Sequence, residues 1–412
     1  MKIVYVLMSN LVCGGHIIVL QHVTRLAKRG HDISICVLDE TIPAKSDSFS
    51  WFPNFNCPVI HPQNFPDGID ICVATFWDTV IPVLKLPAKH KIYFVQSDET
   101  RFYDDLIIKN WVVLTYLCNI NYITEAKWIA EWLKVDFGHQ ATYIPNALDP
   151  DIIHPDKPLK KKRKDKLRIL VEGTIDSPFK KVKEAIEASQ DLDCEIWCVS
   201  NGGHPSPDWK IDRFFYKVDF SQMKHIYSSC DILVKLSSVE GFFGPPLEMM
   251  ACGGVCVVSD VTGYDEYIEH EYNALVIPNG DVDLARQALI RLINDKSLYN
   301  KLQKNGELTA LSMKWEDSIY KLENYYQNLA CQSKSFHVKA ERIELLRQLL
   351  ADHYFLTQDK PEVVNSYKLS KLESTIVSSL KRIKQLVPIS IRTRMKSKLN
   401  KIAKMIIVAS HS

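Results

Sequence analysis

Short apolar runs alternate with an amphipathic segment along the first part of the chain. Ile3–Met8, Asp32–Leu38 and Ile69–Thr75 are apolar and short enough to be buried strands, and Ile17–Arg29 has the length and pattern of a helix. Further strands are expected at Lys91–Gln96 and Trp111–Thr115. Strands that alternate with helices predict a parallel, doubly wound α/β sheet.

The same pattern restarts after a stretch at residues 156–166 that contains proline and is rich in Lys and Arg. Strand-like runs at Leu167–Glu172 and Cys194–Ser200 flank a helical segment near Val182–Gln190. A second doubly wound sheet is therefore expected, facing the first across a cleft. The predicted organisation is a domain at 1–155, a basic hinge at 156–166, a second domain at 167–330 and a tail at 331–412.

The tail combines amphipathic spacing with strong positive charge. Apolar side chains recur at three- and four-residue steps from Leu369 to Val387 and from Ile391 to Ile406. Residues 381–404 contain nine Lys or Arg and no acid. Basic amphipathic helices suit an anionic membrane surface, where each exposed cation contributes on the order of 1 kcal/mol. The alternative is a helical hairpin packed on the protein or on a partner.

Composition narrows the class of protein. A chain of 412 residues, 46% of them hydrophobic, is long enough for two sizeable cores. Its net charge of +2 gives no case for nucleic-acid binding. Eleven cysteines without a Cys-x-x-Cys pair favour reduced, buried thiols in the cytoplasm over zinc or disulfides. No apolar run is long enough to span a bilayer. Peripheral attachment to the inner face of the cell membrane is expected from the basic amphipathic tail.

The segment with the clearest chemistry begins at Glu240 and ends at Glu248, with seven residues between the two acids. It lies between two strand-like runs, and its Pro245-Pro246 pair suits the first turn of a helix, where a missing N–H costs nothing. Gly241 lets the backbone approach a ligand closely. In open α/β sheets ligands bind at the carboxyl ends of strands, so both acids are expected to line one crevice.

Each acid has a predicted role. A helix N-terminus offers unpaired N–H groups and partial positive charge to a phosphate. Glu248, expected in that first turn, would accept two ribose hydroxyls, and Glu240 would meet the transferred sugar. The alternative is that Glu248 only complements the helix dipole and that Glu240 is a solvated loop residue.

These residues, taken with others in the same order along the chain, resemble the retaining glycosyltransferases of family 4, which have the two-domain GT-B fold. The resemblance covers roughly residues 1 to 330. The matching stretches are Met1–Met8 with Gly14-Gly15, Leu26–Ile33, Ile123–Leu133, Ile144–Asp149, Val171–Thr174 with Lys180, Asp231–Ser237, Glu240–Glu248, Gly263–Glu266 and Asn273–Val276.

The resemblance implies a set of site residues. Lys180 stands where the family has a phosphate-binding lysine, but Thr174 replaces an arginine, and Lys235 at a strand end is a candidate replacement. The alternatives are a solvated pair of lysines at 180–181 and a Lys235 that extends to solvent from its strand. The other expected donor contacts are Gly14, Gly15, Gly241, Phe243 and Gly244.

Contacts to the sugar or the acceptor are expected from the first domain. The family often has a histidine after the strand that here ends at Gln96, and this chain has none there. Gln96, Ser97 or Asp98 would supply the polar groups, and His16 beside the two glycines could reach the cleft. A structural role for His16, and a simple tight turn at the glycines, remain open.

The preferred hypothesis is a retaining, metal-independent glycosyltransferase. It would move a sugar, of hexosyl or deoxyhexosyl type, from a nucleotide-sugar donor to a cell-surface polysaccharide or lipid-linked glycan. No metal or other cofactor is expected, since Asp281-Val-Asp283 is unconvincing as a metal loop. A non-catalytic GT-B scaffold subunit and a sugar-nucleotide epimerase are alternatives; a dinucleotide oxidoreductase is disfavoured because Gly-x-Gly-x-x-Gly is absent near Gly14-Gly15.

Overall fold

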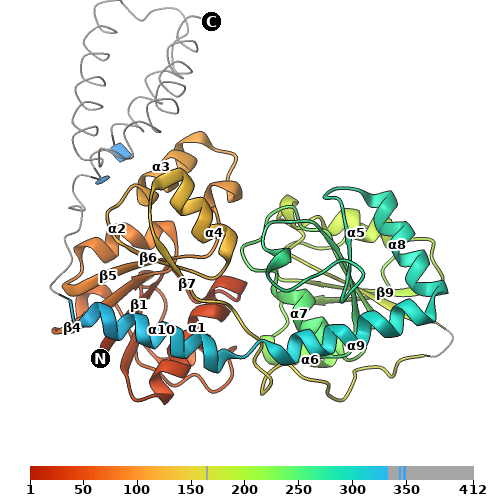
Figure 1. Cartoon of the computed structure of the whole chain (residues 1–412), viewed down its shortest axis with the longest axis horizontal. Coiled ribbons are helices and arrows are strands. Elements are labelled where there is room, and N and C mark those ends of the chain that lie inside the picture. The colour runs from red at the N-terminus through yellow and green to blue at the C-terminus, as the bar shows by residue number, and fades with distance from the viewer. Residues whose placement is uncertain (164–165, 333–342, 345–346, 349–412) are drawn as a thin grey trace, which may run out of the picture.

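Two parallel sheets, each covered by helices, form two lobes that lie side by side (Figure 1). The computed structural model describes residues 1–163, 166–332, 343–344 and 347–348. The first lobe holds the chain from the N-terminus to residue 143, and the second begins at residue 167. This is the doubly wound α/β architecture that the alternating pattern predicts.

The first sheet has seven strands in the order β3-β2-β1-β4-β5-β6-β7, and every neighbouring pair is parallel. Its strands are β1 (Lys2–Leu7), β2 (Asp32–Val37), β3 (Val59–Ile60), β4 (Ile69–Ala74), β5 (Ala88–Val95), β6 (Asn121–Thr124) and β7 (Ala141–Tyr143). The helices of this lobe are α1 (Gly14–Lys28), α2 (Trp77–Lys85), α3 (Leu106–Tyr116) and α4 (Lys127–Trp132).

The second sheet has six strands in the order β10-β9-β8-β11-β12-β13, again all parallel. Its strands are β8 (Leu167–Glu172), β9 (Cys194–Ser200), β10 (Arg213–Tyr216), β11 (Ile232–Lys235), β12 (Val255–Ser259) and β13 (Leu275–Ile277). The helices that follow the linker are α5 (Val182–Ser189), α6 (Met223–Tyr227), α7 (Gly244–Ala251), α8 (Val282–Asn294), α9 (Lys296–Ser312) and α10 (Trp315–Ala330).

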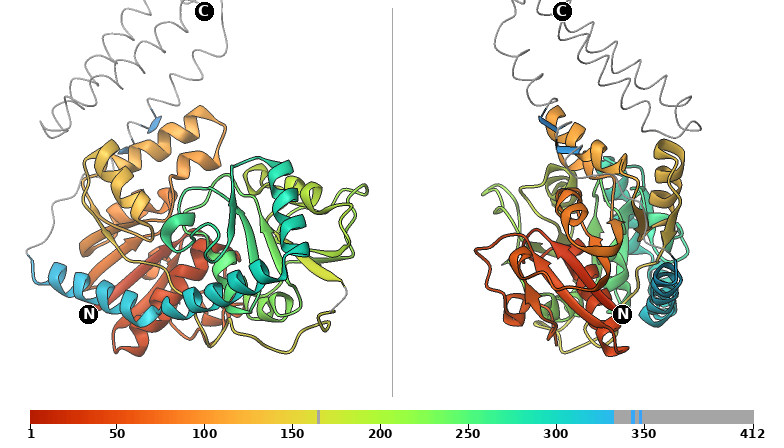
Figure 2. Two further views of the ribbon diagram at one scale, coloured as in Figure 1. Left: turned by 45° about the vertical axis from the view of Figure 1, so that its right-hand side comes forward. Right: turned by 90° about the vertical axis from the view of Figure 1, so that its left-hand side faces the viewer.

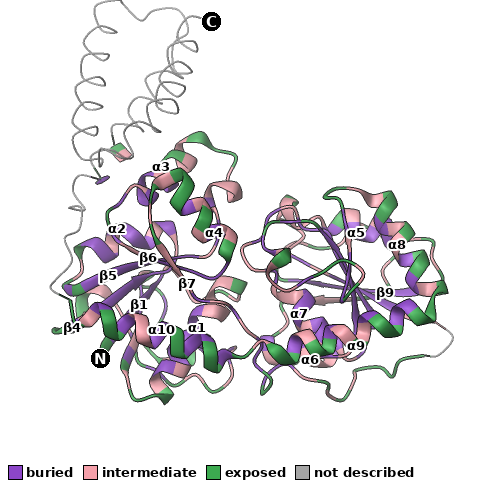
Figure 3. Cartoon of the chain, in the orientation of Figure 1, coloured by how far each residue is buried: buried purple, intermediate pink, exposed green. Residues whose placement is uncertain are grey.

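Burial follows the sheets. The central strands are buried along almost their whole length, whereas the helices expose their outer faces (Figure 3). Nine of the eleven cysteines are buried and all are free thiols, which agrees with the expectation of reduced, packed side chains. Only Cys13 and Cys331 are exposed.

Helix α10 crosses back from the second lobe and packs under the first (Figure 2). The hydroxyl groups of Tyr326 on α10 and Tyr5 on β1 lie 2.7 Å apart in the core. Glu323 accepts hydrogen bonds from Arg29 Nε at 2.8 Å and binds His31 Nε2 at 2.8 Å. The two lobes are therefore joined twice, at the linker and at α10.

The segment Trp111–Thr115, predicted as a strand, is part of helix α3. The prediction was wrong because a short apolar run does not distinguish a strand from a buried helix. The start of α3 is fixed by Asp105, whose carboxylate accepts hydrogen bonds from the N–H groups of Ile107 and Ile108. The strand that belongs at this place in the sheet, β6, is only four residues long.

The basic linker is held to the second lobe. Lys160 Nζ lies 2.8 Å from Glu195 Oε1, and the Leu159 N–H donates to Ser229 Oγ at 2.8 Å. Most of the predicted tail, including its amphipathic stretches, lies outside the described residues. In the part of the chain that is described, no helix combines the length and the apolar character that crossing a bilayer requires.

Candidate functional site

The strand orders place a topological switch point in each sheet. In the first sheet β1 lies between β2 and β4, and in the second β8 lies between β9 and β11, so successive connections leave in opposite directions from each point. Ligands of open α/β sheets bind outside the carboxyl ends of strands at such points. Strand β8 ends at Glu172 and the neighbouring strand β11 ends at Lys235.

Lys235 and Glu172 form a buried ion pair at the second switch point. The ammonium nitrogen lies 2.5 Å from Glu172 Oε2 and 3.9 Å from Glu240 Oε1, and Lys235 is only 2% exposed. Burial alone would lower the pKa of Lys235, but Glu172 and Glu240 hold it above its ordinary value. The lysine is therefore charged and enclosed, and does not extend to solvent as one interpretation of the sequence had it.

Glu240 is buried and bound by a second lysine. Lys180 Nζ lies 2.9 Å from both carboxylate oxygens of Glu240. Burial opposes ionisation of Glu240, yet the charges of Lys180 and Lys235 outweigh it and lower the pKa of the carboxyl group. Glu240 is only 9% exposed and paired with Lys180, so it is not the solvated loop residue of the alternative.

Glu248 has a different environment on helix α7. It is the fifth residue of the helix, past the first turn in which the sequence placed it, so it does not act as a first-turn complement to the dipole. The hydroxyl of Tyr227 on α6 donates to Glu248 Oε2 at 2.8 Å. Burial, together with the nearby Glu172, raises the pKa of Glu248 to about 7 despite the Tyr227 hydrogen bond and the charge of Lys235. This carboxyl group titrates near neutral pH.

The start of α7 has the predicted form. The helix begins at Gly244, and Pro245 and Pro246 occupy its first positions, where their missing N–H groups leave no gap in the hydrogen bonding. A Cβ atom added to Gly244 would lie 3.8 Å from Glu248 Oε1, so this second carboxylate oxygen faces the beginning of the helix. Phe243, just before it, is fully buried.

The remaining predicted residues of the second lobe lie beside this cluster. Lys180 ends the short 3-10 turn Pro178–Lys180 that follows β8. Thr174 contributes its methyl group rather than a charge: a Cβ atom added to Gly202 would lie 2.9 Å from Thr174 Cγ2. The arginine expected at this position of the family is therefore replaced by a packing contact.

The first lobe brings Gly15 and Gln96 together. A Cβ atom on Gly15 would lie 3.2 Å from both terminal atoms of the Gln96 side chain, whereas Gly14 has open space around it. Gln96 Nε2 donates to the carbonyl of Thr75 at 3.1 Å, which leaves its Oε1 without a partner among the described residues. This amide oxygen is therefore a buried, unpaired acceptor beside the first glycines of α1 and just after the end of β5.

The other predicted polar residues of the first lobe differ in whether their side chains already have a hydrogen-bond partner. Ser97 is buried, and its hydroxyl has no partner among the described residues. Asp98 accepts hydrogen bonds from the N–H and the hydroxyl of Thr100, at 3.1 and 2.6 Å, and so caps the following turn. His16, in the first turn of α1, has its Nδ1 bound to the carbonyl of Leu11 in the preceding loop at 2.7 Å, which is a structural contact.

The two lobes touch at the loop that carries Glu240. The indole N–H of Trp128, in the first lobe, donates to the Gly241 carbonyl at 2.9 Å. Asn146 and Glu125, which also precede the second lobe, are joined by a 2.9 Å hydrogen bond. A Cβ atom added to Gly241 would be 1.8 Å from the carbonyl oxygen of Gln96. Glycine is therefore required here for the lobes to close.

Sequence reasoning missed Glu172, Tyr227, Arg101 and Trp128. A charged residue at the end of an apolar strand was a usable signal for Glu172, as it was for Lys235. Tyr227 and Arg101 belong to segments without a recognisable motif. Trp128 lies in the matching stretch Ile123–Leu133, but the resemblance assigned it no role. Only folding brings these three residues to the loop at Glu240 or to Glu248. The residues that they contact are 21 to 161 positions away in the sequence.

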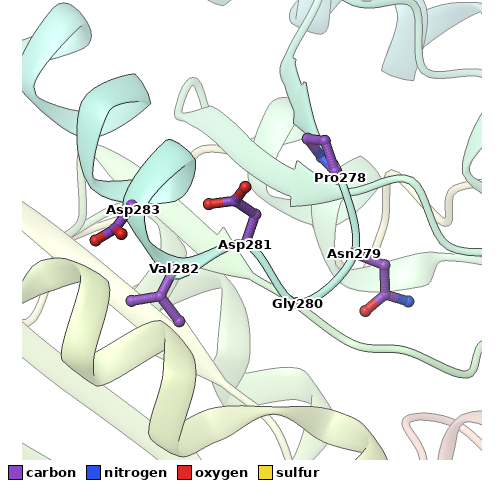
Figure 4. Close-up of a pocket in the computed structure, with 6 residues that line it drawn as sticks. All are labelled: Pro278, Asn279, Gly280, Asp281, Val282 and Asp283. Carbon is purple, nitrogen blue, oxygen red and sulfur yellow. The ribbon is translucent and has the colours of Figure 1, made fainter.

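Asp281 is the residue before helix α8, and Asp283 is the second residue of that helix (Figure 4). Asp281 Oδ1 accepts a hydrogen bond from the Leu284 N–H at 2.8 Å and so caps the helix. The figure shows Asp281 on the turn formed with Pro278, Asn279 and Gly280, and Asp283 on the first turn of the helix. Their placement gives the acids a structural role at the helix start.

The chain is similar to a family of glycosyl transferases and to several solved structures. Residues 212–309, which include Tyr227, Lys235, Glu240 and Glu248, match the family model of glycosyl transferases group 1. The structure superposes on sucrose-phosphate synthase from Thermosynechococcus elongatus with a TM-score of 0.64 at 16% identity, over 80% of this chain and 99% of the other. The chain has the GT-B fold. A further GT-B neighbour is HepE from Anabaena, solved in complex with UDP-glucose, with a TM-score of 0.63 at 13% identity over 80% of this chain and all of the other.

The curated relatives match shorter parts of the chain than the solved structures do. An uncharacterised glycosyltransferase of Methanocaldococcus jannaschii is 23% identical over 244 residues, which is 55% of this chain and 66% of that protein. The serotype-specific mannosyltransferase WbdA of Escherichia coli is 26% identical over 132 residues, which is 30% of this chain and 16% of that protein. The matched stretch thus spans less than two thirds of either relative's length.

Proposed function

We propose that this protein is a retaining glycosyltransferase of the family 4 type that moves a sugar from a nucleotide-sugar donor to a glycan acceptor. The observation that carries the proposal is the cluster at the second switch point: an ionised Glu240 bound by Lys180, and a Glu248 that titrates near neutrality beside the start of α7. The family model matches the residues that supply both acids, and a GT-B neighbour binds UDP-glucose.

In this proposal Lys180 assists departure of the nucleoside diphosphate. Its ammonium group has three donors, and the two oxygens of Glu240 take two of them, which leaves one for a phosphate oxygen. The N-terminus of α7 adds further N–H groups and partial positive charge. Both stabilise the negative charge that develops on the leaving group, with no metal ion required in the proposed mechanism.

Glu248 would bind the donor through the ribose. Its Oε2 accepts the Tyr227 hydroxyl, and its Oε1 faces the start of the helix, where two hydroxyls of a ribose can donate to the carboxylate. Glu240 would contact the transferred sugar, and Gln96 and Ser97 would approach it from the first lobe. For a retaining reaction the acceptor hydroxyl attacks from the face that the diphosphate leaves.

The proposed acceptor is a lipid-linked glycan or a cell-surface polysaccharide assembled at the cytoplasmic face of the membrane. Support comes from the sequence of residues 381–404, with nine cations and no acid, and from the serotype-specific mannosyltransferase among the relatives. The basic tail would hold the enzyme beside anionic lipids.

A panel of nucleoside diphosphates and their sugars, measured by thermal shift, tests donor binding first. One site saturated at a hundredfold excess over Kd stabilises the folded state by roughly 2.7 kcal/mol, which moves Tm by several degrees. The nucleotide that binds is then supplied as its sugar, and release of monosaccharide is measured. Release by the native chain and its loss in Glu248→Ala, with an unchanged Tm without ligand, is the expected result.

Three outcomes would contradict the proposal. Binding of the nucleotide without any release of sugar, with or without added glycan, would indicate a scaffold subunit. Conversion of the sugar nucleotide to an isomer without an acceptor would indicate an epimerase. A Glu248→Ala variant that binds and turns over the donor normally would remove the assignment of the site.

A further inference from the structure

The backbone of the loop at Glu240 is held by side chains of the opposite lobe. Three carbonyl groups around this residue take hydrogen bonds. Trp128 Nε1 donates to the Gly241 carbonyl at 2.9 Å, and Arg101 donates from one terminal nitrogen to the Ser238 carbonyl at 3.0 Å. Two residues of the first lobe thus bind the loop of the second lobe, one on each side of Glu240.

The third carbonyl is that of Glu240 itself, and Arg101 reaches it through one intermediate. The other terminal nitrogen of Arg101 donates to Thr262 Oγ1 at 2.8 Å, and the Thr262 hydroxyl donates to the Glu240 carbonyl at 3.2 Å. A planar guanidinium that makes two separate contacts fixes the position of both acceptors. Arg101 also lies over the ring of Trp128, with its Cζ 5.9 Å from the ring centroid, so the two residues act as a unit.

Arg101 is itself held in place by a buried polar anchor. It belongs to the turn Glu99–Phe102, and Glu99 is 1% exposed. One oxygen of Glu99 accepts the Tyr93 hydroxyl at 2.7 Å and the Trp77 N–H at 2.8 Å. Strand β5 and helix α2 thereby fix the turn, so that Arg101 approaches the second lobe from a rigid base.

We propose that Arg101 and Trp128 are positioning residues that place Glu240 for the reaction when the two lobes are closed. The inference rests on the proposed function, because it gives Glu240 a sugar to face. Neither residue lies in the second lobe, where Lys180, Glu248 and the start of α7 would hold the nucleotide. Binding of the nucleotide and placement of Glu240 are thus separate tasks, carried by different lobes.

The separation has a kinetic consequence. A change at Trp128 or Arg101 leaves the nucleotide contacts of the second lobe in place but releases the backbone of the loop. Interactions that matter only for the reacting arrangement change kcat more than they change ground-state binding. The nucleotide Kd should therefore stay constant while kcat falls.

The first test compares Trp128→Phe, which removes only the indole donor, with Trp132→Phe on the same helix as a matched control. Trp132 packs on Tyr116 and Phe137, and its ring centroid lies 6.4 Å from that of Trp128. Within the described residues it makes no hydrogen bond to the loop, so its replacement controls for altered packing around Trp128. The expected result for Trp128→Phe is a kcat about fivefold lower, the effect of one hydrogen bond, with Kd for the nucleoside diphosphate within about twofold of native. Arg101→Gln should lower kcat about thirtyfold, since a charged donor is lost. Trp132→Phe should match the native enzyme.

A second measurement shows whether Trp128 acts through Glu240. In a Glu240→Gln background, where the carboxylate is already absent, adding Trp128→Phe should cost less than about twofold. A full fivefold further loss there would overturn the inference, as would a Trp128→Phe enzyme no different from Trp132→Phe. A Kd that weakens in parallel with kcat would also count against it.

Hydrogen exchange separates this inference from the proposed function, because it needs no activity. In the free protein, amides of residues 238–244 should exchange about fivefold faster in Trp128→Phe than in native or Trp132→Phe protein. Equal exchange in all three would refute the positioning role even if the enzyme is active. A native chain that binds no nucleotide sugar would instead refute the proposed function, while the exchange result would still decide whether Trp128 holds the loop.

Discussion

Replacing Tyr227 by Phe should shift the pH at which the donor binds. The hydroxyl of Tyr227 donates to Glu248 Oε2 at 2.8 Å and favours the ionised carboxylate. The pKa of Glu248 is nevertheless raised to about 7, because burial opposes ionisation. If the carboxylate accepts the ribose hydroxyls, donor affinity follows its ionised fraction and improves as the pH rises through 7.

The size of the shift follows from the lost hydrogen bond. A hydrogen bond to a charged group contributes about 2 kcal/mol, which corresponds to about 1.5 pKa units. Without it Glu248 would titrate near pH 8.5. At pH 7.5 the ionised fraction would fall from about three quarters to about one tenth, so Kd should weaken roughly eightfold. At pH 9 the difference should shrink to less than about twofold.

The assay is calorimetric titration of the donor, or of its nucleoside diphosphate, at half-unit steps from pH 6 to 9. Both ligands have diphosphate groups that stay ionised over the upper part of this range, where the comparison is decided. Glu248→Gln serves as the control, since it removes the titrating group and should bind weakly with a flat profile. The reasoning is refuted if Tyr227→Phe weakens binding by the same factor at every pH, because that would indicate a distorted pocket rather than a shifted pKa.

Three further changes test other parts of the molecule. Glu240→Gln should lower turnover well below the native rate while the nucleotide Kd stays within about twofold, measured by sugar release and titration; an equal loss of both would contradict a sugar-facing role. Gly241→Ala puts a Cβ atom 1.8 Å from the Gln96 carbonyl oxygen. Turnover should therefore fall roughly tenfold to a hundredfold, while the second lobe still binds nucleotide. Native turnover in this variant would show that closure of the lobes does not require glycine here. Deletion of the residues after Leu380 should abolish sedimentation with anionic vesicles and leave activity on a soluble acceptor intact; unchanged sedimentation would eliminate the membrane role of the tail.

The periodicity of the sequence predicted most of the second sheet. Leu167–Glu172 and Cys194–Ser200 coincide with β8 and β9, because continuous apolar runs are typical of strands buried on both faces. The edge strands β10 and β13 were missed. Strand β10 is four residues long and partly exposed, so it has no clear hydrophobic pattern. Strand β13 is apolar and mostly buried, but its three residues are too few to show a period.

The site was predicted as far as local motifs extend. The Pro-Pro start of α7 and the pair Glu240 and Glu248 depend on neighbours within one loop and one helix, and such features can be recognised from spacing. The ion pair of Lys235 with Glu172 joins two strands 63 residues apart, and its existence follows from the parallel pairing of β8 with β11. Contacts of this kind require the strand order, which spacing alone does not provide.

The state of Lys235 bears on how the chain would manage without the arginine replaced by Thr174. An ammonium group 2.5 Å from Glu172, with only 2% of the residue exposed, is already neutralised and cannot reach a diphosphate without breaking a buried ion pair. Lys235 therefore does not restore the missing cation. Its charge acts instead on the carboxylates around it: together with Lys180 it keeps Glu240 ionised, while Glu172 next to it helps to keep the pKa of Glu248 high. In the proposed mechanism, Lys180 is therefore the lysine that meets the leaving group, and the N-terminus of α7 would supply the remaining stabilisation.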